Sequence, residues 1–167
     1  MQTIPLANSP APSAPFAGMP MWGEAKVMRP FRQARTRDQQ FIAMLEAYRN
    51  TGGIARADEI SHRFRRCNGP DPATLRHWID SRLVLCFEWS DTCWMPWFQF
   101  NRHTLHPHPQ LAPLLAELAA VFDPWETASW FAQPNPWIAG QPPIDRLLQD
   151  LPGVLDAARA DRFVANG

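Results

Sequence analysis

The sequence predicts a mainly α protein with one small β-hairpin, built from a helix-turn-helix-like N-terminal module and a C-terminal helical domain. The 167 residues suffice for one ordinary domain or two small ones, and 46% hydrophobic residues supply a core. The 18 prolines favour many short elements over long coiled coils or a large parallel sheet. Apolar residues recur at helical spacing except in one aromatic-rich segment, where the period changes.

The N-terminal part predicts an arm followed by three helices. Residues 1–35 carry six prolines without periodicity, which is typical of a flexible arm. A first helix starts at Thr36 and ends before Gly52-Gly53. A second covers about residues 56–66, and Asp71 caps a third. The inward positions of the three helices are Phe41, Met44, Leu45 and Tyr48; Ala57, Ile60 and Phe64; and Leu75, Trp78 and Ile79.

Residues 84–89 and 94–100 are rich in aromatic and β-branched residues and predict the hairpin, with Pro96 confining the second strand to a sheet edge or a bulge. A leucine-rich stripe over residues 111–122, a capping pair at Asp123 and Glu126, and prolines 143 and 152 predict further short helices. We expect Ile144, Leu147, Leu148 and Leu151 to point inward. The predicted divisions are an arm over 1–35, a helix-turn-helix-like module with the hairpin over 36–100, and a helical domain over 101–167.

The formal net charge of zero hides two halves of opposite sign. Residues 24–82 hold 12 basic and 7 acidic side chains, whereas residues 83–167 hold 4 and 9. This split predicts that one surface binds an anionic partner and that the other has a different role. A uniformly basic nucleic-acid coat and an acidic, disordered chain are both excluded.

The helix-turn-helix interpretation of residues 54–82 predicts DNA binding. Thr74, Arg76 and His77 would face the major groove, and flanking arginines would contact phosphates. The predicted DNA-binding residues are Arg56, Arg63, Arg65, Arg66, Thr74, Arg76 and His77. The turn at residues 65–70 is longer than the usual 3–4 residues, and the alternative is a helical bundle with a solvated arginine face.

No motif predicts catalysis, a cofactor or a metal site. The nucleophile-elbow, phosphate-loop, dinucleotide and zinc-protease motifs are all missing from the sequence. His103, His106 and His108 cluster near Cys86 and Cys93, but the spacing does not match a zinc site and favours a polar loop. Three cysteines suit free thiols in the cytoplasm. The sequence contains no run of about 20 apolar residues and no secretory signal at its start, so we expect a cytoplasmic protein without a membrane partner.

The aromatic residues are concentrated after residue 86, and most of them are expected in the core. Trp is also a favoured anchor at protein interfaces, and Trp137 is the leading candidate for contacting a partner. Residues 130–148 read WFAQPNPWIAGQPPIDRLL. This segment resembles the C-terminal toxin-binding domain of the Xre/MbcA/ParS antitoxins, with its Trp–hydrophobic pair, Pro-Asn, Gly and Pro–hydrophobic–x–x–Leu. The run Trp97-Phe98-Gln99-Phe100 resembles a subgroup carrying that domain.

The resemblance covers about residues 97–165. It implies a type II antitoxin that directly binds a RES-domain toxin, which degrades or modifies NAD, and that represses its own operon as a homodimer. Two half-sites about 34 Å apart are then expected in the operator. The implied partner-binding residues are Trp130, Pro134, Asn135, Trp137, Gly140, Pro142, Arg159 and Arg162. The alternatives are an orphan transcriptional regulator or adaptor without a cognate toxin and, third, a scaffold that binds no nucleic acid.

Overall fold

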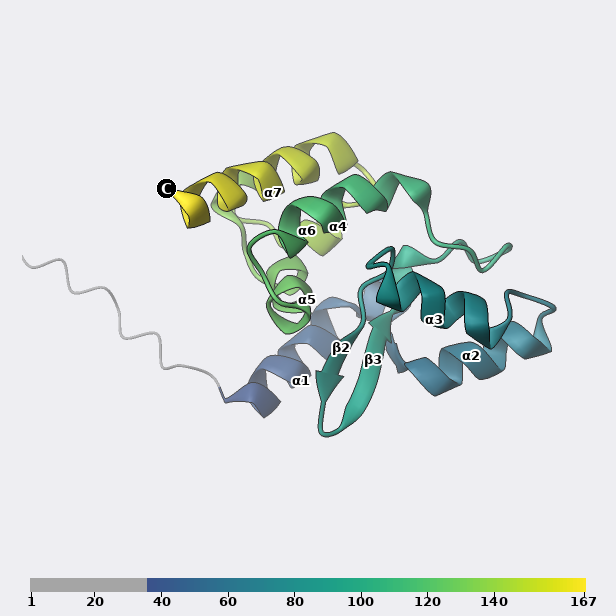
Figure 1. The fold of residues 1–167 in the computed structure, drawn as a ribbon. Helices are drawn as coiled ribbons and strands as arrows, with labels where there is room; N and C mark the ends of the chain where they lie inside the picture. Colours follow the sequence, from purple (N-terminus) through teal and green to yellow (C-terminus); the bar gives the residue numbers. More distant parts are fainter. Residues whose placement is uncertain (1–35) are drawn as a thin grey trace, which may run out of the picture. The chain divides into compact units, whose positions relative to one another are not determined.

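The fold of this protein, described by a computed structural model over residues 36–167, is mostly helical with a small antiparallel sheet (Figure 1). The predicted arm over residues 1–35 lies outside the described residues. The helices are α1 (Arg37–Ala47), α2 (Ala57–Arg66), α3 (Pro72–Asp80), α4 (Ala112–Ala119), α5 (Pro124–Ala132), α6 (Pro143–Arg146) and α7 (Leu151–Asn166). Four 3-10 turns accompany them: η1 (Arg49–Thr51), η2 (Trp97–Gln99), η3 (Pro109–Leu111) and η4 (Pro136–Ile138). The mainly α prediction is therefore confirmed at this level.

The sheet has three strands in the order β1-β3-β2, where the sequence predicted a hairpin alone. Strands β2 (Phe87–Trp89) and β3 (Thr92–Pro96) form the hairpin, with Phe87 opposite Trp94. Strand β1 (Ile54–Arg56) pairs with β3, with Ala55 opposite Met95. The sequence did not predict β1, because three residues are too few to show the alternation of apolar and polar residues by which strands are recognised.

The prediction that Pro96 confines its strand to a sheet edge or a bulge is wrong, because β3 is the central strand and pairs with β1 in a continuous register. Pro96 is the last residue of β3, opposite Ile54. Its missing N–H therefore weakens only the end of the ladder. The next residue resumes the pairing, since the Trp97 N–H donates to the Gly53 carbonyl at 2.9 Å.

Local signals fixed most helix starts as predicted. Thr36 caps α1 in a reciprocal capping box with Gln39, and Asp71 accepts the Thr74 N–H at 2.7 Å at the start of α3. Asp123 and Glu126 form the predicted box at α5. Two inward assignments are wrong, because the Leu45 and Leu148 side chains are exposed. The helix expected around Leu148 ends at Arg146, and Leu148 lies in the turn that follows.

Two hydrophobic clusters lie on either side of the sheet region. The large cluster joins α1, β2 and η2 with α4–α7, and the small cluster joins α2, α3 and β3 with Phe100 and Leu105. The large cluster thus contains side chains from both sides of the boundary predicted at residue 100. The Tyr48 hydroxyl links α1 to α5 by donating to the Ala128 carbonyl at 2.9 Å, and burial raises the pKa of Tyr48 well above its usual value.

The Gln99 side chain, which is 1% exposed, connects the two clusters. Its Oε1 accepts the Leu85 N–H at 2.6 Å, and its Nε2 donates to the Leu85 carbonyl at 3.0 Å. Leu85 and Phe98 belong to the large cluster, whereas Val84 and Phe100 belong to the small one. The amide therefore holds together two segments that each pass from one cluster to the other.

Replacing Gln99 with Leu should lower the free energy of unfolding by about 2–5 kcal/mol, because both backbone groups of Leu85 lose their buried partner. Urea unfolding followed by Trp fluorescence measures this change. The matched control is Gln110→Leu at an exposed position, where we expect a change within about 0.5 kcal/mol. Equal stabilities of the two variants would contradict this role of Gln99.

Candidate functional site

Helices α2 and α3 bury their apolar side chains against each other, and their arginine side chains are exposed to solvent. Ile60 and Phe64 of α2 pack on Leu75 and Trp78 of α3, with the Phe64 and Trp78 rings edge to face. The predicted DNA-binding side chains point away from this contact. The exposed ones, which we call the basic surface, are Arg56, Arg63, Arg65, Arg66, Arg76 and His77. Thr74 is half-buried, at the capped first turn of α3.

Ion pairing divides the arginines of the described chain into two groups. Arg49, Arg146, Arg159 and Arg162 pair with carboxylates. Within residues 36–167, no ion pair involves an arginine of the basic surface. The Arg63 guanidinium lies 5.3 Å from the centre of the Trp97 ring, and that of Arg56 lies 5.6 Å from Trp94. These charges remain available to an anion.

Three carboxylates at the starts of α2 and α3 accept backbone N–H groups instead. Asp58 accepts the Glu59 N–H at 2.9 Å, and Glu59 accepts the Arg56 N–H at 3.3 Å. Hydrogen bonds from Thr74 lower the pKa of Asp71, which caps α3. Asp58, Glu59 and Asp71 therefore lie at helix N-termini, where the helix dipole favours acidic groups, while arginines occupy the last turn of α2.

The helix-turn-helix geometry itself stays a prediction. Residues 67–71 connect α2 to α3, so the connection is longer than the usual turn of about 3–4 residues. The predicted turn at residues 65–70 began too early, because Arg65 and Arg66 are the last residues of α2. Asn68 adopts a positive φ of 52°, and Gly69 packs beneath the buried Leu105 side chain. A side chain at Gly69 would collide with Leu105, which explains why glycine occupies this turn.

The second candidate surface centres on the Asp161 carboxylate of α7. It accepts the indole N–H of Trp130 at 2.7 Å, the Asn135 Nδ2 at 2.7 Å and the indole N–H of Trp137 at 2.8 Å. Asn135 is 4% exposed and also accepts the Trp137 backbone N–H through Oδ1 at 2.9 Å. Three of the predicted partner-binding residues therefore meet on one carboxylate.

Asn135 also shapes the loop around η4. Its backbone N–H donates to the Gln141 carbonyl at 3.1 Å, and its carbonyl accepts from the Gly140 N–H at 2.9 Å. Gly140 has a φ of +73°, a conformation that favours glycine, and the exposed Pro134 and half-buried Pro142 flank the loop. Among these residues Trp137 is distinct, because its side chain is fixed at the nitrogen and is still 57% exposed.

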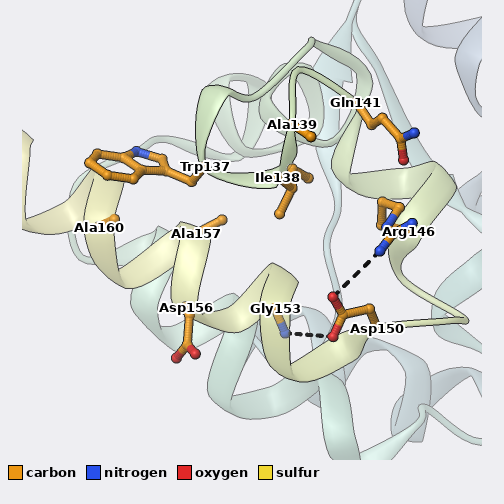
Figure 2. Close-up of a pocket in the computed structure, with 10 residues that line it drawn as sticks. All are labelled: Trp137, Ile138, Ala139, Gln141, Arg146, Asp150, Gly153, Asp156, Ala157 and Ala160. Atoms are coloured by element: carbon orange, nitrogen blue, oxygen red, sulfur yellow. Dashed lines mark hydrogen bonds and ion pairs between the residues drawn. The ribbon is translucent and has the colours of Figure 1, made fainter.

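Trp137 stands at one end of a cleft of about 440 Å³ between the η4 loop and α7 (Figure 2). Ile138, Ala157 and Ala160 supply apolar lining, and the ion pair of Arg146 with Asp150 at 3.7 Å lies at the other end. Beyond the cleft, α7 exposes Phe163 and Val164. This face combines an aromatic anchor with apolar surface, as protein interfaces do.

Arg159 and Arg162, predicted to bind the partner, both reach Glu117 of α4. Arg162 donates to Oε2 at 2.6 Å, and Arg159 lies 3.5 Å from Oε1 and 3.0 Å from Asp156. The hydrogen bond from Arg162 and the charges of both arginines lower the pKa of Glu117. These ion pairs join α7 to α4, and the two helices lie side by side (Figure 1).

Among residues 36–167, no three of His, Cys, Asp and Glu gather into a group that could hold a metal ion. Burial raises the pKa of the Cys86 thiol to about 12, with further contributions from Cys93 and Glu88, so this thiol stays protonated near neutral pH. No helix of the same range is long and apolar enough to cross a bilayer.

The sequence did not single out Asp161. The acidic residue lies 24 positions from Trp137 and carries no local motif, and only the packing of α7 beside the η4 loop brings the two together. In comparisons with known proteins, no family model matches the chain, and no curated protein or solved structure matches it.

Replacing Asp161 with Asn should release at least one indole N–H, because the new amide NH₂ group is a donor facing three donors. Among the eight Trp indole signals in a ¹H–¹⁵N spectrum, we expect those of Trp130 and Trp137 to shift most. Asp156→Asn, at an exposed position of the same helix, should leave both signals in place. An Asp161→Asn spectrum with both signals unchanged would contradict this geometry.

Proposed function

We propose that this protein is a type II antitoxin that binds and neutralises a RES-type, NAD-degrading toxin and represses its own operon by binding DNA. The observation that carries the proposal is Trp137, which is fixed by Asp161 and exposed beside an apolar cleft. It lies in the segment that resembles the toxin-binding domain of the Xre/MbcA/ParS antitoxins.

The geometry around Trp137 favours binding of a protein. The Asp161 carboxylate accepts the hydrogen of the indole nitrogen, so the exposed part of the ring offers apolar area without an unpaired donor. Because the side chain is already held in place, binding costs less side-chain entropy than for a free Trp. The neighbouring cleft accepts apolar side chains of the toxin, and occupation of this face blocks the toxin sterically.

The DNA-binding part of the proposal is supported by the arginines of the basic surface, which form no ion pair with any residue of the described range. Phosphate binding gains most from cations that have no internal partner to lose. Arg76 and His77 extend from α3, and Arg63, Arg65 and Arg66 extend from the last turn of α2. We assign the α2 arginines to phosphates and the α3 residues to base edges.

The alternative is an orphan transcriptional regulator or adaptor that uses the same surfaces without a cognate toxin. A gene for a RES-like protein directly beside this one favours the antitoxin. The third possibility, a scaffold without nucleic acid, is separated from both by the double variant Arg76→Ala/His77→Ala. If this folded variant loses binding to the DNA upstream of the gene, the scaffold is excluded.

The antitoxin proposal is tested by co-expressing the tagged chain with the product of its adjacent gene and scoring growth and co-purification. The neighbour should be toxic alone, and the chain should restore growth and co-elute with it. Trp137→Ala should weaken the complex by about 30-fold or more, as for an interface residue contributing about 2 kcal/mol.

The matched control for this test is Ile42→Ala, since Ile42 is 65% exposed on α1, away from the cleft. This variant should bind as the wild type does. A harmless neighbour, or one that does not bind, would contradict the antitoxin proposal. Equal binding by the Trp137→Ala and wild-type chains would contradict the assigned surface.

A further inference from the structure

The loop over residues 101–106, which follows η2, is a closed and well-bonded turn. The Asn101 N–H donates to the His106 carbonyl at 2.8 Å, and the Leu105 N–H donates to the Asn101 carbonyl at 2.8 Å. The Asn101 side chain accepts the N–H groups of His103 and Thr104 at 2.9 and 3.0 Å. These bonds fix the backbone while the Arg102 and His103 side chains remain exposed.

This loop is anchored on the α2–α3 connection, although the sequence placed it in the other domain. Leu105 is 4% exposed, belongs to the small cluster and covers Gly69. The His106 ring lies 5.5 Å from the Trp78 ring of α3. The loop is therefore held in place by the same helices that carry the basic surface.

Arg102 lies near Trp97, the residue whose ring is covered by Arg63 of the basic surface. A Cβ atom built at Gly52 would lie 3.9 Å from an Arg102 guanidinium nitrogen and 2.9 Å from the Trp97 Cβ, which places Arg102 close to Trp97. The Arg63 guanidinium stacks over the ring of the same Trp97. Within residues 36–167 no ion pair involves Arg102.

We infer that the 101–106 loop is a second phosphate-contacting element of the DNA interface, with Arg102 as its contact. The inference rests on the proposed DNA binding and names a residue outside the helices to which that binding was assigned. Two unpaired guanidinium groups beside one Trp suit neighbouring phosphates of a DNA backbone. A phosphate contact positions the protein and carries no sequence preference.

The test measures binding of the full chain to a labelled DNA duplex from the region upstream of its gene, and to a scrambled duplex, between 50 and 200 mM salt. Arg102→Ala should weaken both complexes by the same factor and make the slope of log K against log salt shallower by about 0.9. Arg102→Lys should keep the wild-type slope, because it retains the charge.

The matched control is Arg49→Ala, since Arg49 lies in the neighbouring η1 turn and is already paired with Glu46 at 2.6 Å. Its slope should equal that of the wild type. A wild-type slope for Arg102→Ala, together with a shallower slope for Arg63→Ala, would overturn the role of the loop and leave the proposed DNA binding intact. If the wild-type chain binds neither duplex, the proposed DNA binding itself fails, and the inference fails with it.

Discussion

The arrangement of the molecule depends on the Gln99 amide, which satisfies both backbone groups of Leu85 in the interior. Such an amide acts like one rung of a β-ladder supplied by a side chain. The residues beside it enter opposite clusters: Phe98 the large one and Phe100 the small one. Because the bond is buried, its loss leaves two polar groups without water, and no apolar replacement compensates.

Each of the two clusters that meet at Gln99 supports one of the two candidate surfaces. The small cluster supports α2, α3 and the 101–106 loop, whose arginines form no ion pair within residues 36–167. The large cluster supports α5, the η4 loop and α7. On α7, Arg159 and Arg162 form ion pairs with Glu117, and Asp161 accepts the indole N–H of Trp137. The two surfaces therefore differ in ion pairing. The arginines of the basic surface form no ion pair within residues 36–167, whereas Arg159 and Arg162, on the helix beside Trp137, pair with Glu117.

The sequence predicted those helix starts that depend on hydrogen bonds between near neighbours in the chain. The caps at Thr36, Asp71 and Asp123 are satisfied within three residues, so the helix starts could be read directly. Strand β1 and Asp161 could not be read in the same way. The partners of β1 lie about 40 residues away in β3, and Asp161 meets its donors only when α7 packs beside the η4 loop. The inward assignment of Leu148 failed for a similar reason, because helical spacing does not reveal where a core ends.

The central claim is that DNA and a protein partner bind different surfaces of one compact unit. Hydrogen–deuterium exchange of the full chain, recorded free, with the upstream duplex and with the neighbouring gene product, tests this most directly. We predict that DNA protects residues 57–82 and 101–106, whereas the protein protects residues 135–142 and 151–166. Protection of the same segments by both ligands, or protection of the α7 face by DNA, would contradict the account.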